Sequence, residues 1–324
     1  MKAVRVHKYG SSEALSYEDM EVPEPRENEV LVKIEAAGVN FIDVYHRNGL
    51  YPVRLPFTMG KEGAGIVDKV GAKASNVKKG QKVACASCIG TYAEYAIFPA
   101  NMLVPVPQKI GLKTAAAVMM QGMTAHYLSN STYDVSKGNT VLVHAAAGGV
   151  GSLLTQMAKM KNAKVIGTAS TEEKAELARQ NGADEVIIYT NADFEQEIKK
   201  ITDGKGVDAV YDGVGKTTFE KSLSCLKPRG IMVSFGQSSG PIPKFDVRVL
   251  NEKGSLFLTR PSLYYYTAER KELLKRASDV FRFIEAGKLK IHIHKEFPLS
   301  EAKEAHNELE SRRSSGKILL MPQL

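Results

Sequence analysis

The sequence predicts an α/β protein in which a β-rich segment precedes a doubly wound parallel sheet. From about residue 140 onward, apolar runs of strand length alternate with segments whose apolar residues recur at helical spacing. Earlier in the chain, short alternating runs are interrupted by glycine and proline, which is typical of antiparallel strands joined by turns. A length of 324 residues allows two domains of ordinary size.

The strands of the second part follow one another at regular intervals. They are expected at Thr140–His144, Lys164–Thr168, Glu185–Tyr189, Val207–Tyr211, Ile231–Phe235 and Ser255–Thr259. Helices are expected between them, at about residues 150–161, 172–181, 193–202 and 217–226. Such alternation builds a parallel sheet with helices on both faces, which binds ligands at the carboxyl ends of its strands.

The first part has the pattern of an antiparallel sheet. Val30–Ala36 alternates apolar and charged residues as a half-buried strand does. Glycine turns punctuate strand-like segments at residues 60–71 and 77–83. The last part of the chain returns to this pattern, because an amphipathic helix after Pro261 is followed by strand-like segments.

These patterns predict two domains. We expect residues 1–122, completed by residues 262–324, to form a β-rich domain. Residues 123–261 are then expected to form a second domain, built on the parallel sheet, that is inserted late in the chain.

The segment Val141–Gly151 carries the strongest functional signal. An apolar run leads into the turn Ala146-Ala-Gly-Gly-Val-Gly151, and a helical pattern follows. Unpaired N–H groups at a helix start bind anions, and glycine at Gly148 and Gly151 lets a pyrophosphate approach the backbone. Because alanine replaces the first glycine of the usual G-x-G-x-x-G pattern, a buried turn in another kind of α/β protein is the alternative.

The next strand ends without the acidic residue that NAD sites usually place there to bind the ribose hydroxyls. Thr168, Ala169 and Ser170 occupy this position, and Lys174 lies one helical turn further on. A hydroxyl and an ammonium suit a 2′-phosphate, which a carboxylate would repel. The pattern favours NADP over NAD, although Ser170 also fits the N-cap of a capping box that ends at Glu173.

Composition and charge narrow the class of protein. The chain is 43% hydrophobic and 25% charged, with a formal net charge of +8. Its basic residues are scattered among acidic ones, which favours a solvated surface over a nucleic-acid interface. No apolar run has the length of a membrane span, and the N-terminus lacks the layout of a signal peptide. Three cysteines form no paired framework, which suits the reducing cytoplasm.

Cys85-Ala-Ser-Cys88 is a C-x-x-C pair that could be half of a zinc site or a redox dithiol. A structural zinc needs four ligands, and the remaining cysteine, Cys225, lies in the expected nucleotide-binding domain. Redox pairs usually open a helix, whereas this pair follows a strand-like segment. The favoured interpretation is two unlinked cysteines in a buried strand and turn, with no metal site.

The chain resembles the medium-chain dehydrogenase/reductase superfamily, and within it the zinc-free quinone oxidoreductase (zeta-crystallin-like) branch. The resemblance covers essentially the whole chain. It rests on Ala146–Gly151 followed by Gln156 and Lys159, on Ala37–Tyr45 and Arg47–Pro52, and on Val233–Gly236 and Gly254–Pro261. It implies a Rossmann-type domain and a GroES-like β-rich catalytic domain.

The chain departs from the zinc alcohol dehydrogenases at the positions that hold their metal. Their G-H-E motif is Gly60-Lys61-Glu62 here, so that a lysine replaces the ligand histidine. The segment of their catalytic cysteine reads Asn40-Phe-Ile-Asp43, and their four-cysteine lobe is missing. Alcohol oxidation without a Lewis acid loses its main electrostatic support, whereas hydride transfer to an electrophilic quinone or enal needs less help.

The resemblance also implies which residues touch the cofactor, NADPH. These are Phe41, Ile42, Asp43, Val44, Tyr45, Thr124, Gly149, Val150, Ser170, Lys174, Tyr189, Val214, Gly236, Gln237, Ser238, Ser239, Gly240, Phe257, Leu258, Thr259 and Arg312. Gly148 joins them from the glycine turn. Lys174, Tyr189 and Arg312 would surround the 2′-phosphate, with Arg313 as the alternative to Arg312.

Four residues are candidates for orienting the electron acceptor, namely Asn40, Asp43, Tyr45 and Tyr51. For Asn40 and Asp43 the alternative is a purely structural hydrogen-bond network. No residue stands out as a general acid, so the proton that the acceptor needs could come from solvent.

These residues predict an NADPH-dependent reductase that transfers hydride from nicotinamide C4 to a quinone without a metal. Reduction of the C=C bond of enals or enones is the alternative within the same class. An RNA-binding protein or a redox-gated interaction partner is the alternative from another class, but the chain lacks clustered base-stacking aromatics beside arginine and lysine. Relatives commonly pair through their nucleotide domains, so the resemblance also implies a homodimer.

Overall fold

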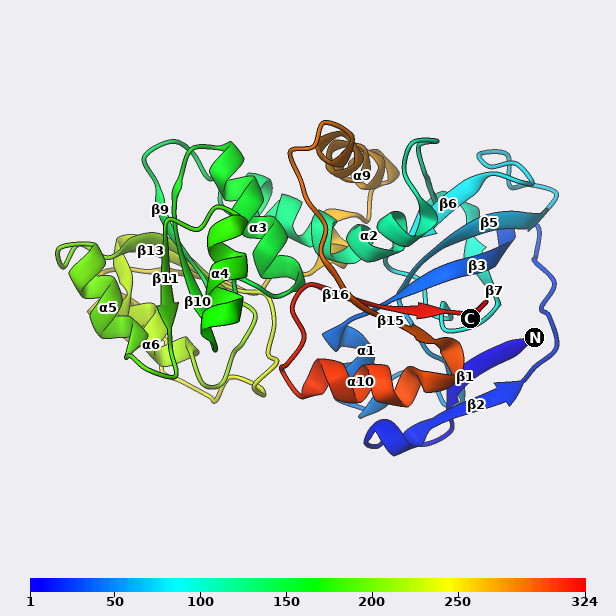
Figure 1. Cartoon of the computed structure of the whole chain (residues 1–324), viewed down its shortest axis with the longest axis horizontal. Coiled ribbons are helices and arrows are strands. Elements are labelled where there is room, and N and C mark those ends of the chain that lie inside the picture. Colours follow the sequence, from blue (N-terminus) through cyan, green and yellow to red (C-terminus); the bar gives the residue numbers. More distant parts are fainter. The chain divides into compact units, whose positions relative to one another are not determined.

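The computed structural model describes residues 1–324 and divides into two compact units (Figure 1). Unit 1 consists of Met1–Met123, Thr267–Ala286 and Ile291–Leu324. Unit 2 consists of Thr124–Tyr266 and Gly287–Lys290. The chain therefore begins in unit 1, forms unit 2 as an insertion, and returns to unit 1 at its end.

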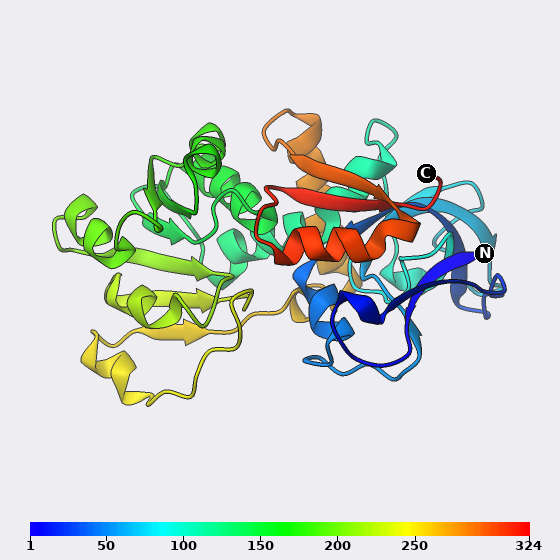
Figure 2. The ribbon, with the colours of Figure 1, turned by 60° about the horizontal axis from the view of Figure 1, so that its bottom comes forward.

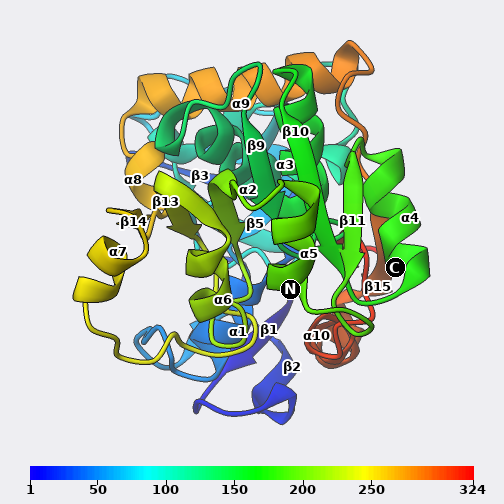
Figure 3. The same cartoon turned by 90° about the vertical axis from the view of Figure 1, so that its left-hand side faces the viewer.

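Unit 2 is built on a six-stranded sheet with the strand order β11-β10-β9-β12-β13-β14. The strands are β9 (Thr140–Val143), β10 (Lys164–Ala169), β11 (Glu185–Ile188), β12 (Val207–Asp212), β13 (Leu226–Ser234) and β14 (Phe257–Thr259). Every neighbouring pair is parallel, and Figure 3 shows the sheet with β14 at one end and β11 at the other. The order reverses between β9 and β12, which is where doubly wound sheets bind ligands. The α/β class and the Rossmann-type sheet predicted from the sequence are confirmed.

Helices cover both faces of this sheet. They are α3 (Gly149–Met160), α4 (Glu172–Gln180), α5 (Phe194–Ile201) and α6 (Phe219–Ser224), with α7 (Arg248–Glu252) and α8 (Leu263–Tyr266) in later connections. The helices α3 and α4 pack on one face, and α5 and α6 pack on the other (Figure 1). Leu142, Ile166 and Val210 of neighbouring strands are fully buried against α5 and α6. Each such side chain contributes about 1.5–3 kcal/mol on burial, which holds the layers together.

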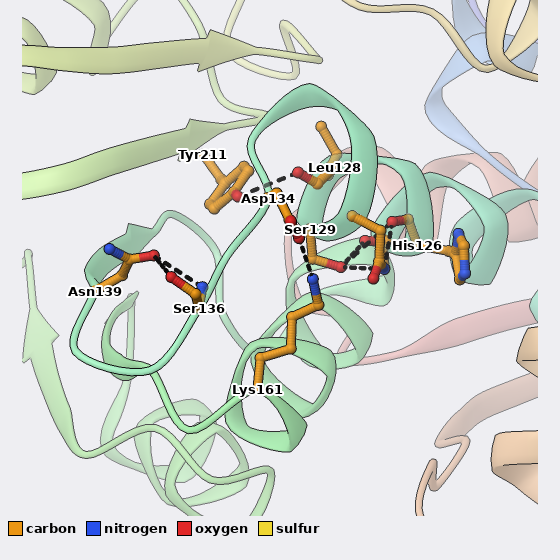
Figure 4. A network of polar contacts seen from close by, with 10 residues as sticks. His126, Leu128, Ser129, Asp134, Ser136, Asn139, Lys161 and Tyr211 are labelled. Carbon is orange, nitrogen blue, oxygen red and sulfur yellow. Dashed lines mark hydrogen bonds and ion pairs between the residues drawn. The ribbon is translucent and has the colours of Figure 1, made fainter.

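Unit 2 begins within the long helix α2 (Leu112–Tyr127), which ends in a short π-helical turn, η3 (Leu128–Thr132). The Tyr211 hydroxyl of β12 donates a hydrogen bond to the Leu128 carbonyl oxygen over 3.2 Å (Figure 4). Further along, the Lys161 ammonium contacts a carboxylate oxygen of Asp134 at 2.6 Å (Figure 4). These contacts fix the end of α2 to the sheet and to α3.

Unit 2 extends to Tyr266, and the expected domain ends nearby, at residue 261. A stacking contact holds Tyr266 within unit 2, since its ring lies parallel to that of Tyr127 with 4.2 Å between the centroids. The Thr132 hydroxyl also donates to the Tyr266 hydroxyl oxygen over 2.9 Å. No sequence pattern around residue 261 signals this packing.

Unit 1 contains two sheets. In the seven-stranded sheet β15-β16-β3-β5-β6-β8 follow one another and β7 pairs with β3, and the three-stranded sheet has the order β2-β1-β4. The strands are β1 (Lys2–Val6), β2 (Leu15–Asp19), β3 (Glu29–Val39), β4 (Phe57–Thr58), β5 (Glu62–Val70), β6 (Lys82–Cys85), β7 (Tyr95–Pro99), β8 (Val104–Pro105), β15 (Ile293–Pro298) and β16 (Lys317–Met321). The helical elements are η1 (Ser12–Ala14), α1 (Phe41–Arg47), η2 (Ala100–Met102), α9 (Arg270–Glu285), η4 (Leu299–Glu301) and α10 (Ala302–Glu310).

The predicted β-rich character of unit 1 is confirmed, with one local correction. The strand expected at residues 77–83 begins only at Lys82, because turns occupy most of the segment before it. The alternation in β3 is as expected, since Val32 and Ile34 are buried and Lys33 between them is exposed. None of the helices in the structure combines the length and the apolar character that a bilayer span requires.

Strand β16 joins the end of the chain to the sheet formed by its beginning. It lies between β15, to which it is parallel, and β3, to which it is antiparallel (Figure 2). At its start Lys317 is 1% exposed, and its ammonium lies 2.5 Å from Glu62 Oε2 and 2.8 Å from Asn40 Oδ1. A Cβ added at Gly38 would lie 2.4 Å from Glu62 Oε2, so only glycine leaves room for this ion pair.

Replacing one partner of the buried ion pair should destabilise the fold strongly. In Lys317→Met the fully buried Glu62 carboxylate loses its counter-charge, and such changes cost about 3–5 kcal/mol of unfolding free energy. Urea unfolding of Lys317→Met, Glu62→Gln and the double variant measures the coupling, and we expect the double variant to be more stable than the sum of the two losses predicts.

Lys113→Met is the matched control in unit 1. Lys113 pairs with Glu296 at 2.6 Å, but both side chains are partly exposed to solvent. Exposed pairs of this kind contribute only about 0–1 kcal/mol. Equal losses in Lys113→Met and Lys317→Met would contradict the role assigned to the buried pair.

Candidate active site

Most of the predicted cofactor residues of unit 2 lie at one edge of its sheet, where the parallel strands end. The glycine turn follows β9, Ser170 follows β10 and Tyr189 follows β11. Val214 follows β12, and the loop 236–240 follows β13. The fold therefore brings together segments that lie far apart in the sequence.

The glycine turn between β9 and α3 is a close approach of two backbone segments. Ala145 has a positive φ of 51°, and a Cβ added at Gly151 would lie only 2.2 Å from the Ala145 carbonyl oxygen. A side chain at Gly151 would therefore push α3 away from the strand. This is the packing role that a dinucleotide-binding turn gives to its last glycine.

The start of α3 presents unpaired main-chain donors. Gly148 is the N-cap and provides no side-chain acceptor, and the Ser152 N–H donates to the Gly148 carbonyl oxygen over 2.9 Å. The N–H groups of Gly149 and Val150 come before this bond and have no partner within the chain. Donors of this kind, free of any side chain, fit the pyrophosphate of a dinucleotide.

A buried histidine, His144, supports the glycine turn through hydrogen bonds. His144 Nδ1 lies 3.0 Å from Thr168 Oγ1, and His144 Nε2 lies 2.9 Å from Ser222 Oγ. Because Thr168 Oγ1 accepts from the Ala145 N–H over 3.3 Å, the Thr168 hydroxyl can donate to His144 Nδ1. Burial lowers the pKa of His144, so the neutral ring donates through Nε2. The network connects β9, β10 and α6.

The predicted capping box at Ser170 is wrong. The N-cap of α4 is Thr171, whose hydroxyl oxygen accepts a hydrogen bond from the Lys174 N–H over 3.3 Å. Ser170 lies one residue before the cap, so the cap does not use its hydroxyl.

Ser170 and Tyr189 lie side by side at the sheet edge. The Tyr189 N–H donates to the Ala169 carbonyl oxygen over 3.1 Å, and the Thr190 hydroxyl donates to the Ser170 carbonyl oxygen over 3.0 Å. The Tyr189 side chain is 46% exposed. Lys174 in the first turn of α4 is half-buried next to the same strand end.

Asp212 organises the turn after β12. Its Oδ1 accepts from the N–H groups of Val214 at 2.7 Å and Gly215 at 3.0 Å, and its Oδ2 accepts from the Thr218 hydroxyl at 2.8 Å. Asp212 is fully buried, so these donors replace the water that a carboxylate would otherwise need. Val214 is thereby held at the end of the strand.

The loop 236–240 is bonded directly to this turn. The Ser239 N–H and hydroxyl both donate to the Val214 carbonyl oxygen, over 2.8 Å and 2.7 Å. A Cβ added at Gly236 would lie 2.6 Å from the Gly213 carbonyl oxygen, so the backbones are in close contact. The predicted residues Gln237, Ser238 and Gly240 belong to the same loop.

Arg260, the residue after β14, binds the beginning of this loop. Its guanidinium donates to the carbonyl oxygens of Ser234 at 2.9 Å and Gly236 at 2.8 Å, and to Gln237 Oε1 at 3.2 Å. An open groove of about 590 Å³ adjoins Arg260. It is lined by Phe219, Ser234, Gln237, Pro241, Ile242, Pro243, Lys244, Phe245, Leu258 and Arg260.

The remaining predicted residues of unit 2 differ in exposure, since those of β14 are partly exposed and Thr124 is buried. Phe257, Leu258 and Thr259 form the terminal strand β14, where Phe257 is 61% exposed and Leu258 is 36% exposed. Thr124 is buried in α2, ahead of the π-helical turn.

In unit 1 the predicted segment 40–45 forms the start of α1. Asn40 is the N-cap, and its N–H donates to Asp43 Oδ2 over 2.9 Å. Its side chain is held on both atoms, because Nδ2 donates to Glu62 Oε2 at 2.9 Å and Oδ1 accepts from Lys317 at 2.8 Å. Glu62 Oε1 in turn accepts from the Met120 N–H of α2 at 2.6 Å. The buried ion pair therefore fixes the beginning of α1.

A line of buried hydrogen bonds leads away from Asp43. The Tyr92 hydroxyl donates to Asp43 Oδ2 over 3.2 Å and lies 3.3 Å from His306 Nε2. His306 Nδ1 lies 2.9 Å from Arg47 Nη1, and the same guanidinium binds Glu310 through two nitrogens at 2.8 and 2.9 Å. Because arginine only donates, His306 Nδ1 accepts and Nε2 carries the hydrogen.

Asp43 itself is completely buried. Loss of solvation raises its pKa from the ordinary 3.8 to about 7, against the opposing effects of the Asn40 N–H, the Lys317 charge and the Tyr92 hydroxyl. Oδ2 accepts the bonds described above, whereas Oδ1 is buried without a partner. The carboxyl group can therefore exist in either protonation state near neutral pH.

The other predicted residues of unit 1, except Val44, are more accessible. Tyr51 is 37% exposed, and its ring meets that of Tyr45 edge-on with 5.3 Å between the centroids. Phe41 and Ile42 are half-buried on α1, and Val44 is buried. Arg312 is exposed after α10 and has a positive φ of 59°.

The cysteines are buried and free. Hydrogen bonding between the two thiols raises the pKa of Cys85 and lowers that of Cys88. Cys225 lies in unit 2, where burial raises its pKa to about 12. No three histidine, cysteine or acidic side chains gather as metal ligands.

Known families match both parts of the chain. The model of the alcohol dehydrogenase GroES-like domain matches residues 26–108, and the model described as zinc-binding dehydrogenase matches residues 149–279. The chain is 44% identical to the quinone oxidoreductase of Pseudomonas aeruginosa over 323 residues, which cover 99% of each chain. The chain belongs to the quinone oxidoreductase branch of the medium-chain dehydrogenase/reductase superfamily.

Other members of this superfamily are similar over the same length. Quinone oxidoreductase 1 of Escherichia coli is 43% identical, over 98% of this chain and 99% of that one. A 2-haloacrylate reductase of a Burkholderia species is 40% identical, over 99% of each chain. The crystal structure of the E. coli quinone oxidoreductase complexed with NADPH has a TM-score of 0.97 at 42% identity, covering 99% of this chain and all of that chain. A native mycobacterial structure complexed with NADPH has a TM-score of 0.96 at 44% identity, with the same coverage.

Several residues of this quinone oxidoreductase family member escaped the sequence prediction. Lys317, Tyr92 and His306 surround the predicted Asn40 and Asp43, but each comes from a distant part of the chain. Lys317 gave one weak signal, since it is a charged residue at the head of an apolar strand. Arg260 lies in the segment 254–261 that carries the resemblance, but nothing in the sequence indicates its contacts with the carbonyl oxygens of Ser234 and Gly236.

Comparison of the wild type with Asp43→Asn should reveal that the carboxyl group of Asp43 takes up a proton on folding. Because the folded pKa is about 7 and the ordinary value is 3.8, the folded protein binds this proton more tightly between these values. The stabilisation is complete below pH 3.8 and is lost as the pH rises to about 7. Relative to Asp43→Asn, the wild type should lose on the order of a few kcal/mol of unfolding free energy from about pH 4 to about pH 7.

Urea unfolding of both proteins at a series of pH values makes this measurement. Burial, together with nearby positive charge, lowers the pKa of His46 to about 4 and of His306 to about 3. Both histidines titrate in the two proteins alike, so their effects cancel in the difference. A difference that stays constant with pH would show that Asp43 keeps its ordinary pKa.

Proposed function

We propose that the protein is an NADPH-dependent quinone reductase. The observation that carries the proposal is the edge of the unit 2 sheet, where the glycine turn lies near a strand end with Ser170 and Lys174 in place of a carboxylate. The relatives named quinone oxidoreductase, and the NADPH complexes among the solved structures, support it. When bound, NADPH supplies a hydride, so that a quinone becomes the hydroquinone monoanion and NADP⁺ is formed.

The residues at this edge suit the parts of NADPH. The N–H groups of Gly149 and Val150 would bind the pyrophosphate. Ser170, Lys174 and Tyr189 would bind the 2′-phosphate, because a hydroxyl and an ammonium donate to it and no carboxylate of that strand end repels it. The other proposed contacts are Thr124, Gly148, Val214, the loop 236–240 and Phe257–Thr259 in unit 2, and Phe41–Tyr45 and Arg312 in unit 1.

The candidate acceptor residues divide by accessibility. Tyr45 and Tyr51 have exposed surface, so they can contact a flat conjugated ring. Asn40 is 7% exposed and Asp43 is fully buried, and both belong to the hydrogen-bond network around Glu62. We assign Asp43 a positioning role, because it holds the start of α1 through the Asn40 N–H.

Reduction of a conjugated C=C bond is the second candidate activity. The observation in its favour is the 40% identity to a 2-haloacrylate reductase over nearly the whole chain. Both reactions add a hydride to an electrophilic carbonyl system, so the same site could serve either acceptor. The relative rates with quinones and enones decide between them.

We also propose a homodimer formed through β14. This strand ends the parallel sheet, so one side of its backbone is unpaired within the chain. Its Phe257 is 61% exposed, and exposed aromatic residues beside an open strand edge are typical of a protein interface.

The free thiols of the chain suit a reducing compartment, and we propose the cytoplasm.

The proposed cofactor and acceptor can be tested together. We expect faster hydride transfer to a panel of quinones from NADPH than from NADH, with enones as slower acceptors. Lys174→Gln should weaken NADPH binding roughly tenfold or more, because a hydrogen bond to a charged group contributes about 1.5–3 kcal/mol. NADH binding should change little, since that cofactor lacks the 2′-phosphate.

Lys164→Gln is the control for this variant. Lys164 begins β10 at the opposite edge of the sheet and is exposed. Cofactor affinity is measured by fluorescence titration and turnover by NADPH absorbance. Equal use of both cofactors by the wild type would refute the NADPH assignment, and inactivity with every quinone would refute the reductase assignment.

The interface proposal predicts an effect of charge at β14. Phe257→Lys should shift the protein from dimer towards monomer at micromolar concentration, because the substitution places a solvated charge at the sheet edge. Sedimentation velocity measures the mass. Val22→Lys is the control, since Val22 is also exposed, at 41%, but belongs to unit 1. A wild type that sediments as a monomer would rule out the interface.

A further inference from the structure

Lys61 is a half-buried cation without a counter-charge. It immediately precedes β5, and it takes part in no ion pair or hydrogen bond of the structure. Its neighbour Glu62 does not neutralise it, because both Glu62 oxygens are bound by Lys317, Asn40 and the Met120 N–H. An ammonium partly removed from water with no carboxylate beside it attracts anions more strongly than one in bulk solvent.

The surroundings of Lys61 connect it to the proposed acceptor residues. His46, on α1, has its ring 6.4 Å from that of Tyr51, which in turn lies 5.3 Å from the ring of Tyr45. Burial and then the Lys61 charge lower the pKa of His46, and the same charge helps to lower the pKa of Cys88. Lys61 also directly precedes Glu62, whose Oε2 accepts a hydrogen bond from Asn40 at the start of α1, the helix that carries Tyr45 and His46.

We propose that Lys61 is the catalytic cation of the acceptor site, whose ammonium donates a hydrogen bond to the carbonyl oxygen of the acceptor. The proposal rests on the proposed reductase function and adds the group that stabilises the reduced acceptor. Hydride addition leaves the electron pair of the carbonyl bond on oxygen, as a hydroquinone monoanion or an enolate. A positively charged donor that contacts this oxygen interacts with it more strongly in the transition state than in the ground state, because negative charge develops there.

The proton balance follows from the same contact. The hydroquinone monoanion needs one proton, which the Lys61 ammonium donates to the oxygen as the N–H bond breaks and the O–H bond forms. Water then returns a proton to the amine, because Lys61 is partly exposed to solvent. No metal and no further reductant enter the step. The site therefore favours acceptors with a carbonyl oxygen over electrophiles without one.

The test compares Lys61→Met, which removes the charge at similar length, with Lys61→Arg, which keeps it. Loss of one oxyanion donor typically lowers kcat by about 10²–10³-fold, and we expect a loss of that order in Lys61→Met with quinones. Lys61→Arg should retain more of the activity. Lys33→Met is the control, because Lys33 is an exposed lysine on β3 of the same unit.

A second measurement does not depend on turnover. The anion of 4-nitrophenol imitates the oxyanion of a reduced quinone, and its yellow absorbance reports ionisation on binding. Wild type and Lys33→Met should bind the phenolate and lower the pKa of the bound phenol, whereas Lys61→Met should bind the anion at least about tenfold more weakly. Thermal unfolding and NADPH titration of each variant identify any loss of folding or of cofactor binding.

The outcomes separate the two proposals. Wild-type turnover of quinones with unchanged kcat and phenolate affinity in Lys61→Met would overturn the role of Lys61 and leave the reductase function standing. Phenolate binding that depends on Lys61, in a protein that reduces no quinone or enone, would overturn the proposed function and retain an oxyanion site at Lys61. Loss of both quinone turnover and phenolate binding in Lys61→Met, but not in Lys33→Met, supports the proposal.

Discussion

The ion pair between Lys317 and Glu62 is the constraint on which unit 1 depends. Both groups are removed from water, so each requires the other and further hydrogen bonds. These bonds reach Asn40 before α1 and Met120 in α2, and Lys317 itself begins the strand β16. Segments from the beginning, middle and end of the chain are thus held at one point, and the candidate acceptor residues are attached to it through α1.

Unit 2 reaches a comparable rigidity without buried charge pairs at its edge. Its loops are held by direct contact of backbones, as at Gly151 and Gly236, and by the buried Asp212, which accepts three hydrogen bonds. Arg260 donates to the carbonyl oxygens of Ser234, at the end of β13, and of Gly236, in the loop that follows this strand. A ligand that binds such an edge meets donors already in place, so little ordering is required of the protein.

Local patterns explain what could be predicted from the sequence. The strands and helices of unit 2 follow from hydrophobic periodicity, and the ligand edge follows from the parallel topology and the glycine turn. The N-cap of α4 is hard to predict, because Ser170 and Thr171 are both good N-cap residues and the structure uses Thr171. The partners of Asp43 could not be predicted, since Tyr92 and His306 reach it only through tertiary packing.

The line of hydrogen bonds from Arg47 to Asp43 has a fixed direction, because a guanidinium cannot accept. Each group in it, through His306 and Tyr92, passes its hydrogen towards Asp43 Oδ2, and this leaves Oδ1 as the place where an added proton can reside. The carboxyl group can then change its charge while every neighbouring bond keeps its orientation. When Asp43 gains or loses a proton, the electrostatic potential at Asn40 changes but the hydrogen bonds of Asn40 keep their geometry. The start of α1 therefore stays in place while the carboxyl group beside it titrates.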